Sequence, residues 1–178
     1  SRRGDGIMIR SVVGKDGAVE VESVAAGPGD PLCCPTRKVR NNYRLQGGNL
    51  LLASSQEQGV LSLADIQGVT WRLVRLRRDG RVSEGVKVTA TFGDGKVFGS
   101  GGCNRYSAGV VEKGPPEFSV GPAASTRMAC PDPAGGFEDR YLAALQAAHR
   151  FGFLLGNLVL HYRKGDSGET MEFERDGK

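Results

Sequence analysis

Short runs of alternating apolar and polar residues, separated by glycine-rich turns, extend through most of this 178-residue chain. Such a pattern predicts many half-buried β-strands. The clearest run is 86–92, where apolar and polar residues alternate at every position. A hairpin is predicted from 7–10 and 19–22 around a turn at 14–17. Further strands are predicted at 39–45, 50–53, 69–76, 96–99, 151–155, 158–162 and 171–174.

One segment, at about 136–149, has the period of an amphipathic helix. Glu138 and Asp139 would lie in its first turn and His149 and Arg150 in its last, as the helix dipole favours. The apolar stripe consists of Phe137, Tyr141, Leu142, Leu145 and Ala148. The predicted fold class is therefore α+β, a mostly antiparallel sheet with this helix packed on it.

The chain is expected to contain two regions. Residues 27–35 are rich in proline and glycine and predict a loop, whereas 54–65 lack clear periodicity and suggest a boundary near 58–63. We expect a β-rich N-terminal region at 1–60 and a second domain at 65–176. A hydrophobic content of 39% is sufficient for buried cores.

The formal charge of +4 is modest, and basic and acidic residues are interspersed. Two basic runs, 37–44 and 72–81, lie beside Tyr43 and Trp71, but no nucleic-acid-binding motif accompanies them, so the sequence argues against direct nucleic-acid binding. An envelope protein or an anionic envelope component is the better expected partner. No window has the length and hydrophobicity of a transmembrane helix, and the polar opening residues do not resemble a signal peptide.

Two cysteine motifs are the most informative feature: Gly-Gly-Cys-Asn-Arg-Tyr at 101–106 and Ser-Thr-Arg-Met-Ala-Cys at 125–130. With the Trp-Arg-Leu at 71–73, their order and spacing resemble the META domain family over about 65–175. The matching motif residues are Trp71, Gly102, Cys103, Asn104, Thr126, Met128 and Cys130. The resemblance implies an antiparallel sheet with a packed helix, in a bacterial envelope or secreted protein linked to heat shock or antibiotic tolerance. It supplies no catalytic residues.

The N-terminal region carries a second resemblance. Its segment 29–35, followed by Tyr-Arg-Leu at 43–45 and the glycines at 47–48, is similar to the C-terminal part of the LppP/LprE lipoprotein family, over about 5–55. This resemblance implies a lipid-anchored or secreted parent protein.

The four cysteines suggest disulfide bonds. Cys103 and Cys130 each follow a strand-to-loop transition in one domain, so a structural disulfide between them is expected; buried free thiols are the alternative. Cys33 and Cys34 are adjacent, and they either form a vicinal disulfide, stay free or pair elsewhere. No Cys-x-x-Cys pair is present, which argues against a zinc site.

No catalytic set is apparent in the sequence. His149 and His161 are not tied to a cysteine by any signature, and the glycine run at 99–102 matches neither a nucleophile elbow nor a P-loop. We therefore expect no catalytic residues and no cofactor, and predict a non-enzymatic, stress- or envelope-related binding or structural module. The alternatives are a thiol redox protein or thiol-dependent enzyme using Cys33 and Cys34, and a small-ligand carrier with a cavity between sheet and helix.

Overall fold

The computed structural model describes residues 8–28, 30, 35–76, 80–83, 85–131 and 133–177. The chain divides into two compact units. The first contains residues 1–61 and the hairpin tip 152–156, and the second contains 62–151 and 157–178. The chain passes from the first unit to the second after Leu61, and it returns to the first unit only for residues 152–156.

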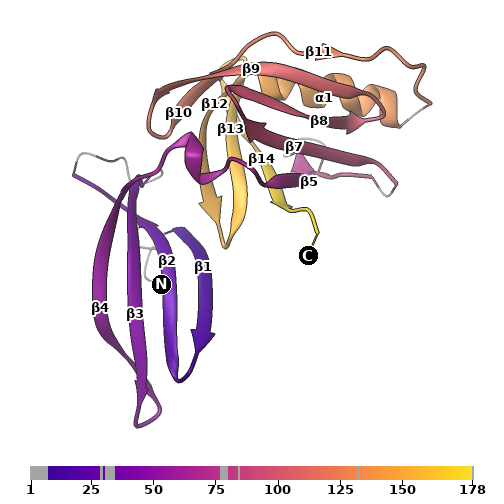
Figure 1. Ribbon diagram of the computed structural model, residues 1–178. Coiled ribbons are helices and arrows are strands. Elements are labelled where there is room, and N and C mark those ends of the chain that lie inside the picture. The colour runs from indigo at the N-terminus through magenta and orange to yellow at the C-terminus, as the bar shows by residue number, and fades with distance from the viewer. Residues whose placement is uncertain are drawn as a thin grey trace. The chain divides into compact units, whose positions relative to one another are not determined.

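The first unit is a four-stranded antiparallel sheet in the order β1-β2-β3-β4 (Figure 1). The tight turns at 16–17 and 47–48 have positive φ values at both central positions, which is the geometry that two-residue hairpin turns require. The strands are β1 (Met8–Lys15), β2 (Ala18–Ala25), β3 (Arg37–Gln46) and β4 (Asn49–Val60).

Strand β4 corrects one expectation from the sequence. The polar segment from Ser54 was expected to lack regular structure, but it continues as a strand to Val60. Its backbone pairs with β3, with Ser55 opposite Asn41 and Gln56 opposite Arg40. Every residue of β4 is exposed, so this edge strand needs no apolar alternation, and periodicity alone does not reveal it.

The second unit contains the remaining strands, one short 3₁₀ helix and one α-helix. Its elements are η1 (Leu63–Asp65), β5 (Thr70–Leu76), β6 (Gly80–Arg81), β7 (Lys87–Gly93), β8 (Lys96–Gly102), β9 (Arg105–Gly114), β10 (Glu117–Val120), β11 (Ala124–Ser125), α1 (Ala134–Gln146), β12 (Ala148–Leu154), β13 (Asn157–Lys164) and β14 (Ser167–Arg175).

The sheet of the second unit closes into a barrel. Its order is β10-β12-β13-β14-β5-β7-β8-β9, and β10 also pairs with β9, which completes the ring. The pairs between these strands are antiparallel, so the predicted α+β fold with a mostly antiparallel sheet is confirmed. Closure itself was not expected, because β9 and β10 were not recognised in the sequence.

Large apolar side chains fill the second unit, and those with almost no exposed surface include Trp71, Phe92, Phe118, Leu158, Leu160, Met171 and Phe173. Helix α1 buries Phe137, Tyr141 and Leu145. The helix contacts β8, β10 and β13, which lie at different places around the ring. It therefore lies across one open end of the barrel, with its apolar stripe facing inward.

The helix ends earlier than its sequence suggested. It runs over Ala134–Gln146, not 136–149, and β12 begins at Ala148. His149 and Arg150 therefore lie in a strand, and the prediction that they are helix-terminal cations was wrong. Backbone pairing explains the early end, because the Arg163 N–H donates to the Ala147 carbonyl at 3.4 Å. Glu138 is likewise not in the first turn.

Candidate functional site

The two cysteine motifs meet beside the N-terminal half of α1. Cys103 and Cys130 form a disulfide with an S–S distance of 2.01 Å and a Cα–Cα distance of 6.1 Å. Cys103 immediately follows β8, and Cys130 lies in the segment that leads from β11 into α1. The bond therefore ties the end of a barrel strand to the entrance of the helix.

Asn104 is the centre of the hydrogen bonding around this disulfide, and it is only 5% exposed. Its Oδ1 accepts the Thr126 hydroxyl and the Met128 backbone N–H, both at 2.9 Å. Its Nδ2 lies 3.1 Å from the Cys130 Sγ. The side chain thus binds a segment more than twenty residues away, whereas a local turn bond is the common use of asparagine at such a position.

Glu138 of α1 completes the network from the helix side. One oxygen, Oε2, accepts the backbone N–H of Asn104 at 2.7 Å and that of Cys103 at 3.3 Å. The other, Oε1, accepts the Asn104 side-chain amide at 2.9 Å. Glu138 is 6% exposed, and a buried carboxyl group requires such compensation. Three N–H donors supply it here.

Two glycines, Gly101 and Gly102, leave room for the side chain of Glu138 and for the turn before Cys103. A Cβ on Gly101 would lie 2.6 Å from the Cγ of Glu138, which is closer than side chains tolerate. Gly102 has a φ of +116°, a conformation that residues with a side chain rarely adopt. The glycine pair before Cys103 therefore admits the helix carboxylate and turns the chain toward the disulfide. We refer to Gly101, Cys103, Asn104, Thr126, Cys130 and Glu138 as the motif network.

Sequence reasoning missed Glu138. It was read as a first-turn residue favoured by the helix dipole, although the helix begins at Ala134 and places it in the second turn. The available signal was its position, because Glu138, Tyr141 and Leu145 follow at i, i+3 and i+7 and so share one helix face. A carboxylate on the apolar stripe of a helix indicates a buried polar partner.

The remaining motif residues have separate surroundings. Trp71 is fully buried, its indole N–H donates to the Ile66 carbonyl at 3.2 Å, and the Arg175 guanidinium lies 5.3 Å from its ring centre. Met128 contributes only backbone groups to the motif network, and its side chain is 61% exposed. Trp71 is therefore a core residue, whereas the Met128 side chain faces solvent.

A second buried polar group lies beside the motif network. The Tyr106 hydroxyl donates to the Thr89 carbonyl at 2.9 Å, which leaves its lone pairs to accept the Tyr141 hydroxyl at 2.7 Å. Burial, the largest cause for both residues, raises their pKa values well above that of an exposed tyrosine. Both phenols are neutral structural groups that join α1 to β7 and β9.

A cleft of about 770 Å³ in the second unit lies over β5, β14 and the segments 81–83 and 85–87. Its basic residues are Arg72, Arg75, Arg81 and Lys87, and its acidic residues are Glu172, Glu174 and Asp176. We refer to these seven residues and the space between them as the charged cleft. Its walls are predominantly polar.

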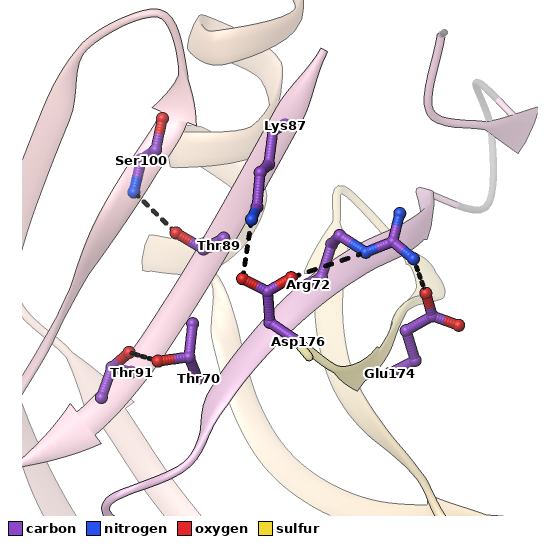
Figure 2. A network of polar contacts seen from close by, with 8 residues as sticks. All are labelled: Thr70, Arg72, Lys87, Thr89, Thr91, Ser100, Glu174 and Asp176. Carbon is purple, nitrogen blue, oxygen red and sulfur yellow. Dashed lines mark hydrogen bonds and ion pairs between the residues drawn. The ribbon is translucent and has the colours of Figure 1, made fainter. Parts of the chain in front are cut away.

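Ion pairs cross the charged cleft, and Figure 2 shows part of them. Arg72 pairs with Glu174 and lies 3.9 Å from Asp176, which also binds Lys87 at 2.8 Å. Arg75 is 4.0 Å from Glu172. Arg81 is exposed and forms no ion pair with a described residue.

The two histidines share a smaller cleft of about 540 Å³ with Asp166 and Glu169. Burial lowers the pKa of His161, and the neighbouring charges of His149 and Arg150 lower it further. Within the described part of the chain, no three His, Cys, Asp or Glu residues are grouped so as to hold a metal ion. Neither histidine contacts the Cys103–Cys130 disulfide in any described hydrogen bond.

Two sequence-based expectations concern other parts of the chain. Cys33 and Cys34 lie outside the described residues, and so does the vicinal disulfide expected for them. In the ranges that the structure describes, no helix has the length and hydrophobicity needed to cross a bilayer.

Comparison with known proteins gives a family and one solved relative. The family model of the META domain matches residues 64–177. The NMR structure of a protein from Burkholderia xenovorans is similar, with a TM-score of 0.52 and 29% identity, covering 65% of this chain and 86% of that one. A comparison with curated proteins gives no match. Nothing supports the LppP/LprE resemblance of 5–55, which stays a prediction. The resemblance seen in the cysteine motifs is confirmed: this chain belongs to the META domain family.

Proposed function

We propose that this protein is a non-enzymatic binding or structural module of the bacterial cell envelope, or a secreted one, that acts under envelope stress. The observation that carries this proposal is the motif network. Its two sulfurs are bonded to each other, and the polar atoms of Asn104, Thr126 and Glu138 bind one another and the backbone. Groups used in this way hold a scaffold together and have little capacity left for a substrate.

The disulfide supports the location. Disulfides form and persist in oxidising compartments such as the bacterial periplasm and the extracellular medium. The Cys103–Cys130 bond closes a loop of 27 residues in sequence separation. Such a bond is expected to stabilise a domain by about 3 to 4 kcal/mol. A protein that relies on it works best where the bond is maintained.

A thiol-trapping experiment tests the location. The complete gene is expressed from its own promoter with a C-terminal epitope tag, and cells are acid-quenched before alkylation with a maleimide reagent. We expect Cys103 and Cys130 to be unlabelled without prior reduction, and the protein to fractionate with the periplasm, membranes or medium. Cytosolic protein with both thiols labelled would overturn the proposed location.

The charged cleft is the proposed contact surface, and its partner is an anionic envelope component. Four basic side chains face three acidic ones there. The Arg75–Glu172 pair joins an exposed guanidinium to a partly exposed carboxylate at 4.0 Å. Surface ion pairs of this kind contribute only about 0 to 1 kcal/mol each, so an incoming anion can replace the carboxylate at little cost. Arg81, without an ion pair to a described residue, offers a second guanidinium for the same anion.

Binding to lipid vesicles tests this surface. The full chain is mixed with vesicles of phosphatidylglycerol and phosphatidylcholine, or of phosphatidylcholine alone, and sedimented at low salt. We expect binding only to the anionic vesicles, and a loss of at least about tenfold in affinity for Arg75→Gln/Arg81→Gln. Arg105→Gln, an exposed arginine of β9, is the matched control. Equal binding by both variants would rule out the charged cleft.

A small-ligand carrier is the second candidate, favoured by one observation. A cleft of about 390 Å³ lies between α1 and the β5 and β13 strands, lined by Leu76, Ala143, Ala144 and Tyr162 among others. Its volume is within the range of small-molecule sites. Native mass spectrometry of freshly purified protein tests this candidate: a retained ligand would support it, and an unliganded mass would count against it.

The thiol redox alternative rests on Cys33 and Cys34 and is tested separately. Thiol titration of the native protein in glutathione buffers of defined potential would reveal a pair that cycles under physiological conditions. We expect no such cycling, and its detection would replace the scaffold proposal with a redox function.

A further inference from the structure

The sheet of the first unit has two faces of opposite character, and its strand register defines them. Directly paired residues of antiparallel strands share a face. Val12 pairs with Val21, and Leu45 pairs with Leu50. These residues, together with Tyr43 and its partner Leu52, lie on one side of the sheet. We call this the apolar face: Val12, Val21, Tyr43, Leu45, Leu50 and Leu52.

The opposite face is charged. Arg40 pairs across the sheet with Glu22, and its guanidinium lies 2.8 Å from that carboxylate and 3.7 Å from Glu20. Apolar residues also lie on this side: Val13 is paired with Glu20, Leu51 with Arg44, and the buried Val24 with Lys38 and Met8. The sheet therefore has one face suited to water and one suited to another protein layer.

The apolar face is largely open to solvent. Val12 is 58% exposed, Leu45 59%, Leu50 53% and Leu52 57%. Four large aliphatic side chains on one face of a single sheet, each more than half exposed, exceed the scattered apolar residues of an ordinary surface. A sheet with one apolar face is stable when that face is buried against a second layer.

We propose that a second copy of this chain covers the apolar face, so that two four-stranded sheets pack face to face about a two-fold axis. An apolar sheet face is complementary to itself, because two such faces pack about 10 Å apart by interdigitating their side chains. An isologous two-fold dimer is also the commonest form of homo-oligomer.

The size of the face fits this occupant. Four strands about 4.8 Å apart, each with about eight residues at roughly 3.3 Å, give a flat area of roughly 500 Å². Side chains that stand up from the sheet expose a larger surface, which approaches the roughly 800 Å² per partner of a standard protein interface. The Arg37–Glu57 ion pair lies at the end of this face farthest from Leu45 and Leu50, and Asn41, which pairs with Val21 and Ser55, lies between the two ends.

Neighbouring residues of one strand provide a matched test. Leu52 and Leu51 have similar exposure, 57% and 50%, but lie on opposite faces of β4. In sedimentation velocity on the full chain from about 1 to about 100 µM, we expect a dimer. Leu52→Glu should raise the dimer dissociation constant at least about 100-fold, and Leu51→Glu less than about threefold.

A second pair keeps the test decisive if Leu52→Glu fails to fold, which circular dichroism would detect. Val12→Glu and Val13→Glu repeat the comparison in β1, where the exposures are 58% and 55%. A monomeric wild-type protein over the whole concentration range would overturn the proposal. So would a dimer that Leu52→Glu and Val12→Glu leave intact, because it would use another surface. Concentration-dependent hydrogen-exchange protection of the apolar face would support it.

Discussion

Glu138 in α1 accepts the backbone N–H of Asn104 at 2.7 Å, and so joins the helix to the loop that follows β8. The same carboxylate receives the Asn104 side-chain amide at 2.9 Å. One acidic side chain thereby satisfies both the main chain and the side chain of the residue that organises the cysteine motifs.

Replacing Glu138 with Gln should destabilise the second unit by about 1.5 to 3 kcal/mol, because an amide nitrogen would face an N–H donor where an acceptor is needed. Urea unfolding followed by the fluorescence of Trp71, the chain's single tryptophan, reports on the barrel. Asp139→Asn, at the next and exposed position, is the control and should change stability by less than about 0.5 kcal/mol. Equal effects of the two variants would contradict a special role for Glu138.

Removing the disulfide should have a larger effect. The double variant Cys103→Ser/Cys130→Ser loses a cross-link with a sequence separation of 27, and the unfolding free energy of the second unit should fall by about 3 to 4 kcal/mol. Trp71 fluorescence in urea, with and without reductant, measures the loss. Reductant should weaken the wild-type barrel to the level of the variant and leave the variant itself unchanged. A wild-type transition insensitive to reduction would speak against the prediction.

The two buried tyrosines should respond unequally to loss of their hydroxyls. Tyr106→Phe removes the acceptor of the Tyr141 hydroxyl and the donor to Thr89, so it should cost about 1 to 3 kcal/mol. Tyr141→Phe leaves the Tyr106–Thr89 bond intact and should cost about 1 kcal/mol or less. Urea denaturation of the two single variants and of the double variant gives the coupling free energy between the two hydroxyls. A larger effect for Tyr141→Phe would reverse the donor order assigned here.

His161 should make the protein less stable in mild acid. Burial, and then the charges of His149 and Arg150, lower its pKa in the folded state. The unfolded chain therefore binds a proton at His161 more tightly than the folded protein does, so protonation lowers the free energy of unfolding. The stability that neutral His161 contributes is fully present above the unfolded pKa of about 6.5 and is lost as pH falls through the folded pKa. Urea unfolding at several pH values should show this loss, and His161→Asn should reduce it.

NMR titration of the His161 ring protons gives a direct check of the same effect. The His161 pKa should lie below the ordinary value, and His149→Asn should raise it because one neighbouring positive charge is removed. A midpoint at or above the ordinary value would refute the assigned direction.

The sequence predicted the elements that local signals define. Alternation at 86–92 corresponds to β7, and the two-glycine turn at 47–48 joins β3 to β4. The paired cysteine motifs led to the family and to a disulfide that the structure contains. In these cases residues close together in the sequence, or motifs at a specific spacing, determine the structure.

Other features depended on distant partners and were missed. His149 belongs to β12 because β13 offers a pairing strand, and residues around 54–60 form a strand because β3 lies beside them. Glu138 acquired its role from Asn104, which is 34 residues away. Helical periodicity and local polarity contain no information on such partners, so these assignments required the fold.

Pairing of β10 with both β9 and β12 has a consequence for aggregation. A closed ring of strands leaves few unpaired backbone groups, whereas the open sheet of the first unit has two edge strands, β1 and β4. The Gly156 N–H donates to the Ile9 carbonyl of β1 at 2.9 Å, whereas β4 pairs with β3 alone among the strands that the structure describes. Strand β4 carries three successive leucines and no lysine or proline that would discourage strand addition. Fibrillar self-association of this protein, under conditions that destabilise it, should therefore begin at the N-terminal sheet while the barrel resists recruitment.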